Sequence, residues 1–145
     1  MLSKKTKYAI KALVALSKVY KSKIPLSISS ISQSEDIPHK FLEGILLELK
    51  NQGILTSRMG LKGGYLLLKD PKQIMLSTII RATGGPIALA PCVSINFYAP
   101  CDECLDETTC GLRNTLLQVR VASIKILSKT SLADIVKQEI KLNKK

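Results

Sequence analysis

The sequence predicts a mainly α-helical fold with one small β-hairpin. Apolar residues recur at helical spacing on both sides of residue 54, and a glycine-rich connection near residue 60 joins two short β-prone runs. A chain of 145 residues can form one domain, or one small domain with an appended element, and can bury a real core. We therefore expect a compact N-terminal unit, followed by a loop and a long helix.

Two helices and a turn are predicted at the start of the chain. The first helix spans residues 4 to 21, with Ser3 in the position of its N-cap and lysines along its outer face. Ser27 can cap a short second helix over residues 28 to 34. A tight turn at residues 35 to 37 then leads into a third helix.

The third helix is predicted to begin at Pro38, which suits the first helical position because an N–H there would have no partner. It runs to about Gln52, and Gly53 ends it. Its predicted buried face consists of Phe41, Leu42, Ile45, Leu46 and Leu49. Two helices separated by so short a turn have helix-turn-helix geometry.

A β-hairpin is predicted directly after these helices. Residues 54 to 58 and 65 to 68 are β-prone, and the connection at residues 59 to 64 is rich in glycine. A hairpin in this position is a wing, so the element order predicts a winged helix-turn-helix DNA-binding domain. We expect that domain to occupy residues 1 to 83.

Three further segments follow. A helix over residues 77 to 82 is stopped by Gly84-Gly85-Pro86, which opens a cysteine-bearing sensor loop at residues 84 to 110. A long dimerisation helix is expected at residues 111 to 130, and a C-terminal helix and basic tail at residues 131 to 145. The apolar stripe of the long helix consists of Leu112, Leu116, Val119, Ile124 and Leu127. Pairing with a second subunit would bury this stripe in a homodimer, whereas the alternative is a helix packed on its own domain.

Charge points to a polyanionic partner. The net charge is +11 and the isoelectric point is near 9.6, which costs a compact chain self-repulsion. Residues 1 to 75 carry 13 basic and 5 acidic side chains, and residues 111 to 145 carry 8 and 2. Residues 86 to 110 hold four acids and no Lys or Arg. The expected partner is double-stranded DNA, although charge alone also fits a basic protein without one.

The sequence shows no signal peptide, because no long apolar run follows the basic residues 1 to 11. Its apolar stretches are too short and interrupted to cross a membrane. We therefore expect a cytoplasmic protein with no membrane partner. In a reducing compartment, clustered cysteines more often bind metal or act in redox chemistry than form disulfides.

The predicted DNA contacts come from the first helix, the third helix and the wing. Side chains at the start of the third helix would enter the major groove, where His and Lys donate to guanine or phosphate and Glu accepts from cytosine. Cations and glycines of the wing suit the minor groove or phosphates. The predicted DNA-binding residues are Lys4, Pro38, His39, Lys40, Glu43, Arg58, Lys62, Gly63, Gly64 and Tyr65. The alternatives are that the third helix only exposes a solvated face and that the wing is an ordinary glycine-rich hairpin, without contact to DNA in either case.

All four cysteines lie in one stretch, as Cys92, Cys101, Cys104 and Cys110, with the spacing C-x8-C-x2-C-x5-C. Four thiolates complete either a tetrahedral zinc site or an iron–sulfur cluster, [2Fe–2S] or [4Fe–4S], and the spacing does not choose between them. Free thiols acting as a redox switch are the alternative. Nearby acids are expected to raise the pKa of the thiols, which disfavours reactive free thiolates.

Several short motifs resemble one bacterial family. They are Lys7-Tyr8-Ala9-Ile10, Phe41-Leu42-Glu43 within residues 37 to 49, Gly63-Gly64-Tyr65, Ile80-Arg81-Ala82 followed by Gly85-Pro86, Cys110-Gly111-Leu112-Arg113 and Ser131-Leu132-Ala133-Asp134-Ile135. In this order, over about residues 1 to 137, the chain resembles the winged-helix regulators that include IscR, NsrR and CymR, the Rrf2 family. The resemblance implies a homodimer formed by the long helix and DNA read by the third helix and the wing.

The same resemblance implies that cluster-bearing members use three loop cysteines, matched here by Cys92, Cys104 and Cys110. Glu43 matches an acid that helps some members discriminate between operators. Two ligands of the family are missing: Arg113 replaces the histidine of IscR-like members, and Lys7 replaces an acid of nitric-oxide-sensing members. We therefore expect an all-cysteine site that includes Cys101. CymR-like members act without a cluster, but four loop cysteines argue against that branch.

Three functions remain open from the sequence. The favoured hypothesis is a dimeric transcription regulator that binds a palindromic operator and senses redox or iron–sulfur status through a cysteine-ligated cluster. The second is a zinc-stabilised or thiol-based winged-helix repressor without a cluster. The third is an iron–sulfur carrier, which would have no need of a wing or a recognition helix. No catalytic constellation is present, so an enzyme is not expected.

Overall fold

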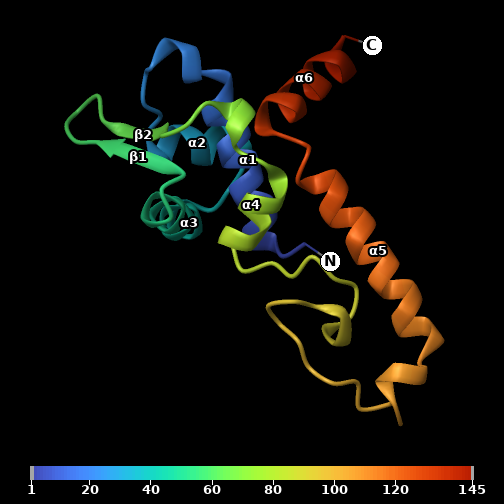
Figure 1. Ribbon diagram of the computed structural model, residues 1–145. Coiled ribbons are helices and arrows are strands. Elements are labelled where there is room, and N and C mark those ends of the chain that lie inside the picture. Colours follow the sequence, from blue (N-terminus) through green and yellow to red (C-terminus); the bar gives the residue numbers. More distant parts are fainter. Residues whose placement is uncertain (1, 145) are drawn as a thin grey trace.

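The computed structural model describes residues 2 to 144 (Figure 1). The helices are α1 (Lys4–Lys18), α2 (Ile28–Glu35), α3 (His39–Asn51), α4 (Leu76–Ala82), α5 (Gly111–Leu127) and α6 (Leu132–Asn143). The strands are β1 (Leu55–Arg58) and β2 (Gly64–Leu67), and short 3-10 helices are η1 (Tyr20–Ser22), η2 (Pro71–Gln73), η3 (Pro91–Val93) and η4 (Glu107–Thr109). The predicted fold class, mainly α with a small β-hairpin wing, is confirmed. None of the helices in residues 2 to 144 is long and apolar enough to span a membrane.

The N-terminal unit, which we define as residues 2 to 83, has a continuous apolar core. Its fully buried large side chains include Leu13, Leu16, Ile31, Leu42, Leu46, Leu49, Leu55 and Ile79. Each such side chain contributes roughly 1.5–3 kcal/mol by leaving water. The strands pair antiparallel in the register Leu55 to Leu67 and Arg58 to Gly64, so the hairpin projects beyond the helices (Figure 1).

Three details of the N-terminal unit differ from the prediction. α1 ends at Lys18, and η1 follows with Lys23 as its C-cap, which has a left-handed φ of 54°. Pro38 is the N-cap of α3, one position before the first helical residue. Phe41 is 45% exposed, so its predicted burial is wrong. Its ring instead meets the edge of Tyr8 on α1, with ring centroids 5.7 Å apart.

α6 returns to the N-terminal unit at the end of the chain. The Leu76 N–H donates to Thr130 O and the Leu132 N–H donates to Ile74 O, each at 2.9 Å, so Met75 and Ser131 form an isolated β-bridge. Leu132 is fully buried in the core that α1 and α3 form. Figure 1 shows α6 beside one end of α1. The C-terminal end of α5 is therefore tied to the N-terminal unit.

The arm, which we define as residues 84 to 130, extends away from this unit. Its loop turns back at the lower end of α5, and α5 runs alongside the loop (Figure 1). None of the residues of α5 is buried. Leu116, Ile124 and Leu127 are half-buried, whereas Leu112 and Val119 are exposed. The predicted single apolar stripe is therefore divided between two faces of the helix.

Candidate nucleic-acid interface and cysteine cavity

The N-terminal end of α3 presents polar side chains to solvent. His39 and Lys40 are its first two residues, and both are exposed; Glu43 is exposed one turn later. The first turn carries no acid, so the positive end of the helix dipole and the Lys40 ammonium act together on an anion. Pro38 holds the chain at the N-cap. This end of α3 brings four of the predicted DNA-binding residues together.

α1 crosses α3 with its N-terminal part near the C-terminal part of α3, which separates Lys4 from that end. Lys11 Nζ donates to Glu35 O beside the turn, while Lys5 Nζ pairs at 2.6 Å with Glu48 near the other end of α3. Lys4 therefore lies toward the C-terminal end of α3. Lys11 is nearer to the N-terminal end of α3, although it is not among the predicted contacts. Lys7 and Lys11 are four residues apart, so both lie on one face of α1. This spacing is the feature of the sequence that could have identified Lys11.

The wing carries two exposed cations, one at the end of a strand and one in the connection between the strands. Arg58 ends β1 next to the glycine-rich connection, and its Nη1 donates to Lys23 O at 3.5 Å. Lys62 is exposed at the tip between β1 and β2, beside Met59 and Leu61, whose side chains are fully exposed. Both cations can reach a phosphate without leaving an ion pair, because neither forms one among the described residues.

The glycines of the wing have a structural reason for their place. A Cβ at Gly63 would lie 2.3 Å from Arg58 O, and a Cβ at Gly64 would lie 2.3 Å from Leu26 O. Gly64 also has a φ of 150°, in the region that favours glycine. Tyr65 then exchanges two backbone hydrogen bonds with Leu26, at 2.8 and 3.0 Å. These three residues shape the wing, whereas Arg58 and Lys62 supply its charge.

The four cysteines, although spread along the loop, line one cavity of about 180 Å³. Cys92 is buried on η3, Cys104 and Cys110 are half-buried, and Cys101 is exposed. The other lining residues are Glu103, Glu107, Leu112, Arg113 and Leu116. Cys110 is also the N-cap of α5, since its Sγ accepts from the Arg113 N–H at 3.4 Å. The cavity therefore connects the loop with the first turn of α5.

The acids of the loop are engaged with their own neighbours. The Tyr98 hydroxyl donates to both oxygens of Glu107 at 3.1 Å, and this hydrogen bond raises the pKa of Tyr98. Arg113 Nε lies 3.4 Å from Glu107, as an ion pair without hydrogen-bond geometry. Asp106 accepts from the Thr108 hydroxyl and N–H, at 2.8 and 2.9 Å, which lowers the pKa of its carboxyl. Part of the acidic charge of the loop is thus compensated locally.

One thiol in the cavity has a shifted pKa. Partial desolvation raises the pKa of Cys104, and the neighbouring Cys110 thiol raises it further. The prediction that nearby acids raise it is wrong in its cause: the only contribution from an acidic residue is the backbone carbonyl of Asp106, which accepts from Cys104 Sγ at 3.5 Å and lowers the pKa. The direction still disfavours a reactive free thiolate at Cys104.

The possible metal ligands of the cavity do not gather around one point. Within residues 2 to 144, no three His, Cys, Asp or Glu side chains converge closely enough to hold one metal ion. A tetrahedral zinc site needs four sulfurs about 2.3 Å from one point, whereas a cluster distributes its thiolates over separate irons. All four thiols of this chain line one shared cavity.

The comparisons with known proteins agree with this arrangement of helix-turn-helix, wing and loop. The Rrf2 family model, described as an iron-dependent transcriptional regulator, matches residues 2–138. The chain is 38% identical over 138 residues to the rrf2-like HTH-type transcriptional regulator of Rhodobacter capsulatus, covering 94% of this chain and 92% of that relative. It superposes with a TM-score of 0.79 on CymR (YrzC), the global cysteine regulator of B. subtilis, at 28% identity over 95% of this chain and 97% of the other. For T. potens IscR the TM-score is 0.74 at 22% identity, over 96% and 88%, which shows the fold alone. The resemblance inferred from the motifs is confirmed: the chain belongs to the Rrf2 family of DNA-binding transcription regulators and is not an enzyme.

Proposed function

We propose that the chain acts as a homodimer that binds a palindromic operator and reports redox or iron–sulfur status through a cluster held by Cys92, Cys101, Cys104 and Cys110. The observation that carries the proposal is the single cavity that all four cysteines line, at the first turn of α5. A purely DNA-binding protein has no need of such a cavity. The family description, an iron-dependent transcriptional regulator, points the same way.

The exposed face of α5 supports the dimer. Leu112, Val119 and Ile126 recur every seven residues and are 68%, 39% and 65% exposed. Thr115 and Ala122 lie between them at the alternating three- and four-residue spacing of a coiled-coil seam, and both are exposed. Exposure of these apolar side chains to water is unfavourable, and a second copy of α5 packed against them would bury the seam. The half-buried side chains Leu116, Ile124 and Leu127 meanwhile face the arm's own loop.

A bound cluster would supply redox chemistry and a cross-link between segments of the loop that are distant in sequence. Cys92 belongs to η3, which contacts α5 through the hydrogen bond from Arg120 Nη1 to Val93 O at 2.6 Å. Cys110 caps α5 itself. The thiols therefore constrain α5 at its N-terminal end, while the β-bridge at Ser131 holds its other end. Releasing the first constraint changes the position of α5, and in a dimer this changes the spacing of the two α3 helices.

The decisive experiment is the visible absorption spectrum of protein purified without oxygen, together with analysis of iron, sulfide and zinc. Brown protein that contains sulfide supports the proposal. Colourless protein that contains zinc replaces the sensor with a structural site. Colourless protein without either metal contradicts both and leaves a thiol-based repressor.

The role of Cys101 needs a separate test, because it is the most exposed of the four cysteines. If it is the fourth ligand, Cys101→Ser lowers cluster content nearly as much as Cys104→Ser. Arg113 cannot replace it, since a guanidinium has no free lone pair at neutral pH. Leu105→Ser, at a fully exposed neighbour in the same loop, is the matched control. If Cys101→Ser keeps its colour while Cys104→Ser loses it, the cluster is held by three cysteines and Cys101 is not a ligand.

The proposed DNA surface is tested by salt and by substitution. A dimer presents Arg58 and Lys62 twice, so affinity should fall with a log–log salt slope steeper than about −2. Lys40→Ala is expected to weaken specific binding more than non-specific binding, because it removes a contact to base edges. Lys62→Ala, at the wing, should weaken both alike. Equal losses for Lys40→Ala would contradict the assignment of α3 as the recognition helix.

A further inference from the structure

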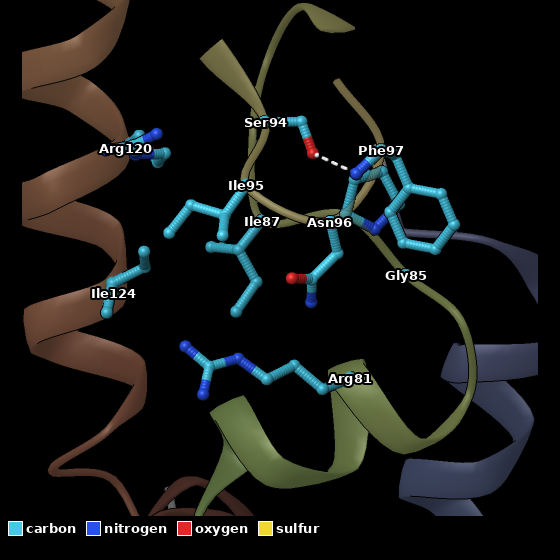
Figure 2. A pocket seen from close by; sticks show the side chains of 10 residues that line it. Arg81, Gly85, Ile87, Ser94, Ile95, Asn96, Phe97, Arg120 and Ile124 are labelled. Carbon is cyan, nitrogen blue, oxygen red and sulfur yellow. Dashed lines mark hydrogen bonds between the residues drawn. The ribbon is translucent and has the colours of Figure 1, made fainter.

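A second cavity, of about 230 Å³, lies between α4, the first part of the loop and α5. Figure 2 shows Arg81 reaching from α4 toward α5, with Arg120 and Ile124 of α5 opposite it. The lining residues are Arg81, Gly85, Pro86, Ile87, Ser94, Ile95, Asn96, Phe97, Arg120 and Ile124. None of them is a cysteine or one of the predicted DNA contacts, so the cavity is separate from both sites.

The charge of this cavity is positive on two sides. Arg81 and Arg120 line it from different helices, and no acid is among the lining residues. Neither guanidinium forms an ion pair within residues 2 to 144. Two like charges that share a cavity without a counter-ion repel each other, and each would gain from an anion placed between them.

Arg120 is held in place with one donor unused. Its Nη1 donates to Val93 O at 2.6 Å, which fixes the guanidinium against η3. Its Nε is buried and has no hydrogen-bond partner in the described structure. The remaining Nη2 group makes no hydrogen bond and is not fully buried, so it is the donor of Arg120 that an oxygen anion in the cavity can reach. Asn96 adds an amide group that points into the cavity from the loop (Figure 2).

The rest of the lining is apolar and close to these cations. Ile87, Ile95 and Ile124 lie between the two arginines in Figure 2, and Phe97 borders the cavity. Pockets for drug-sized ligands are larger, about 300–1,000 Å³, so this volume suits a small metabolite. Cations beside branched apolar side chains match a molecule with an anionic head and a short hydrocarbon body.

We propose that this cavity binds a small organic anion, with one carboxylate between Arg81 and Arg120 and a short branched apolar body against Ile87, Ile95 and Ile124. Such a ligand would bridge α4 of the N-terminal unit and α5 of the arm. The proposal does not depend on the cysteines or on a cluster. It concerns a site for a second chemical signal in the same chain.

The test is calorimetric titration of the full-length protein with 4-methylpentanoate, its neutral amide 4-methylpentanamide, and inorganic phosphate. The carboxylate should bind once per chain. The amide should bind at least about tenfold more weakly, because it loses the charge-assisted hydrogen bonds. Phosphate should also bind more weakly, because it lacks the apolar body. Equal binding of all three, or no binding of the carboxylate, overturns the proposal; the second outcome would fit a cavity that a partner subunit fills.

Arg81→Gln is the informative variant, since Arg81 is exposed and its guanidinium makes no ion pair within residues 2 to 144. It should weaken binding of 4-methylpentanoate by about tenfold or more. Arg81→Lys should retain part of the affinity. Lys72→Gln removes the same charge on η2, away from the cavity, and should bind like the unmodified protein. If Lys72→Gln and Arg81→Gln weaken binding equally, net charge and not the cavity is responsible.

Discussion

The N-terminal unit and the arm differ in how many of their side chains are buried. In the unit, α1, α3 and the strands share a continuous core in which Leu13, Leu42 and Leu46 are fully buried. In the arm, buried side chains are confined to Cys92, Val93 and Ser94, and none belongs to α5. A lone helix gains little stability without a packed face. The comparison indicates that the unit is stable through its own packing, whereas the arm has few buried side chains to stabilise it.

The largest effect is expected from Leu132→Ala. Leu132 is fully buried in the core although it lies after the arm in sequence. Losing its side chain should lower the free energy of unfolding by about 2–5 kcal/mol, through lost burial and the remaining cavity. Leu105→Ala, at a fully exposed leucine of the arm, should change it by less than about 0.5 kcal/mol. Urea unfolding measures the free energy of unfolding of both variants. Similar losses for Leu132→Ala and Leu105→Ala would contradict the difference in packing between the core and the arm.

A smaller effect, on association and not on folding, is expected from Ile126→Asp. The side chain is 65% exposed on the proposed seam, and a carboxylate there would be buried in a dimer without a partner. We expect dimerisation to weaken by roughly 2 kcal/mol or more. Leu142→Asp, on α6 at 69% exposure, is the matched control. Sedimentation equilibrium distinguishes them, and an unchanged dimer in Ile126→Asp would remove α5 from the interface.

The junction between arm and unit should respond to acid. Hydrogen bonds from the Ser131 hydroxyl and N–H hold the pKa of the Asp134 carboxyl below its ordinary value. Because the folded pKa is the lower one, this contribution is present above the ordinary pKa, about 3.9, and is lost as pH falls through the folded pKa. Ser131→Ala should cost about 1 kcal/mol near neutral pH.

Asp134→Asn is the companion measurement. Denaturant unfolding at decreasing pH should show the difference between Asp134→Asn and the unmodified protein shrinking in acid, since protonation removes the carboxylate that the substitution removes. A constant difference would mean that the capping box at Ser131 does not set this pH dependence.

The smallest effect is expected from Glu43→Ala. Glu43 is exposed one turn into α3, where an acid repels phosphate and acts mainly by rejecting wrong bases. The substitution should relax sequence preference while changing the affinity for the best site by less than about tenfold. Selection from a random operator library measures this. The same motif recovered for both proteins would contradict the proposed role.

Local features were the ones that the sequence could predict. Ser3 and Ser27 accept backbone N–H groups as N-caps, as expected from their positions before helical runs. Gly63 and Gly64 lie where the glycine-rich part of the hairpin was predicted, and a Cβ at either would come within 2.3 Å of a backbone oxygen. Asp36 takes a left-handed φ of 52° in the predicted turn between α2 and α3. Each of these depends on residues close in the chain, so composition and spacing carry the information.

Features set by distant contacts were not predictable in the same way. The apolar residues of α5 divide into half-buried ones, such as Leu116, and exposed ones, such as Val119, and periodicity alone cannot show how much of each side chain the loop covers. Phe41 resembles a core residue in sequence, but it is 45% exposed and packs against the ring of Tyr8 on another helix. The cavities appear only when loop and helix are placed together in space.

The burial of Leu132 has a consequence for the order of events during synthesis. Its core neighbours on α1 are separated from it by more than a hundred residues, and the β-bridge between Met75 and Ser131 closes at the same point. Contacts so distant in sequence form only after the whole intervening chain exists. A nascent chain that ends within α5 therefore lacks the residue that completes the DNA-binding core. The packing of the N-terminal core is therefore completed only after the whole arm, residues 84 to 130, has been made.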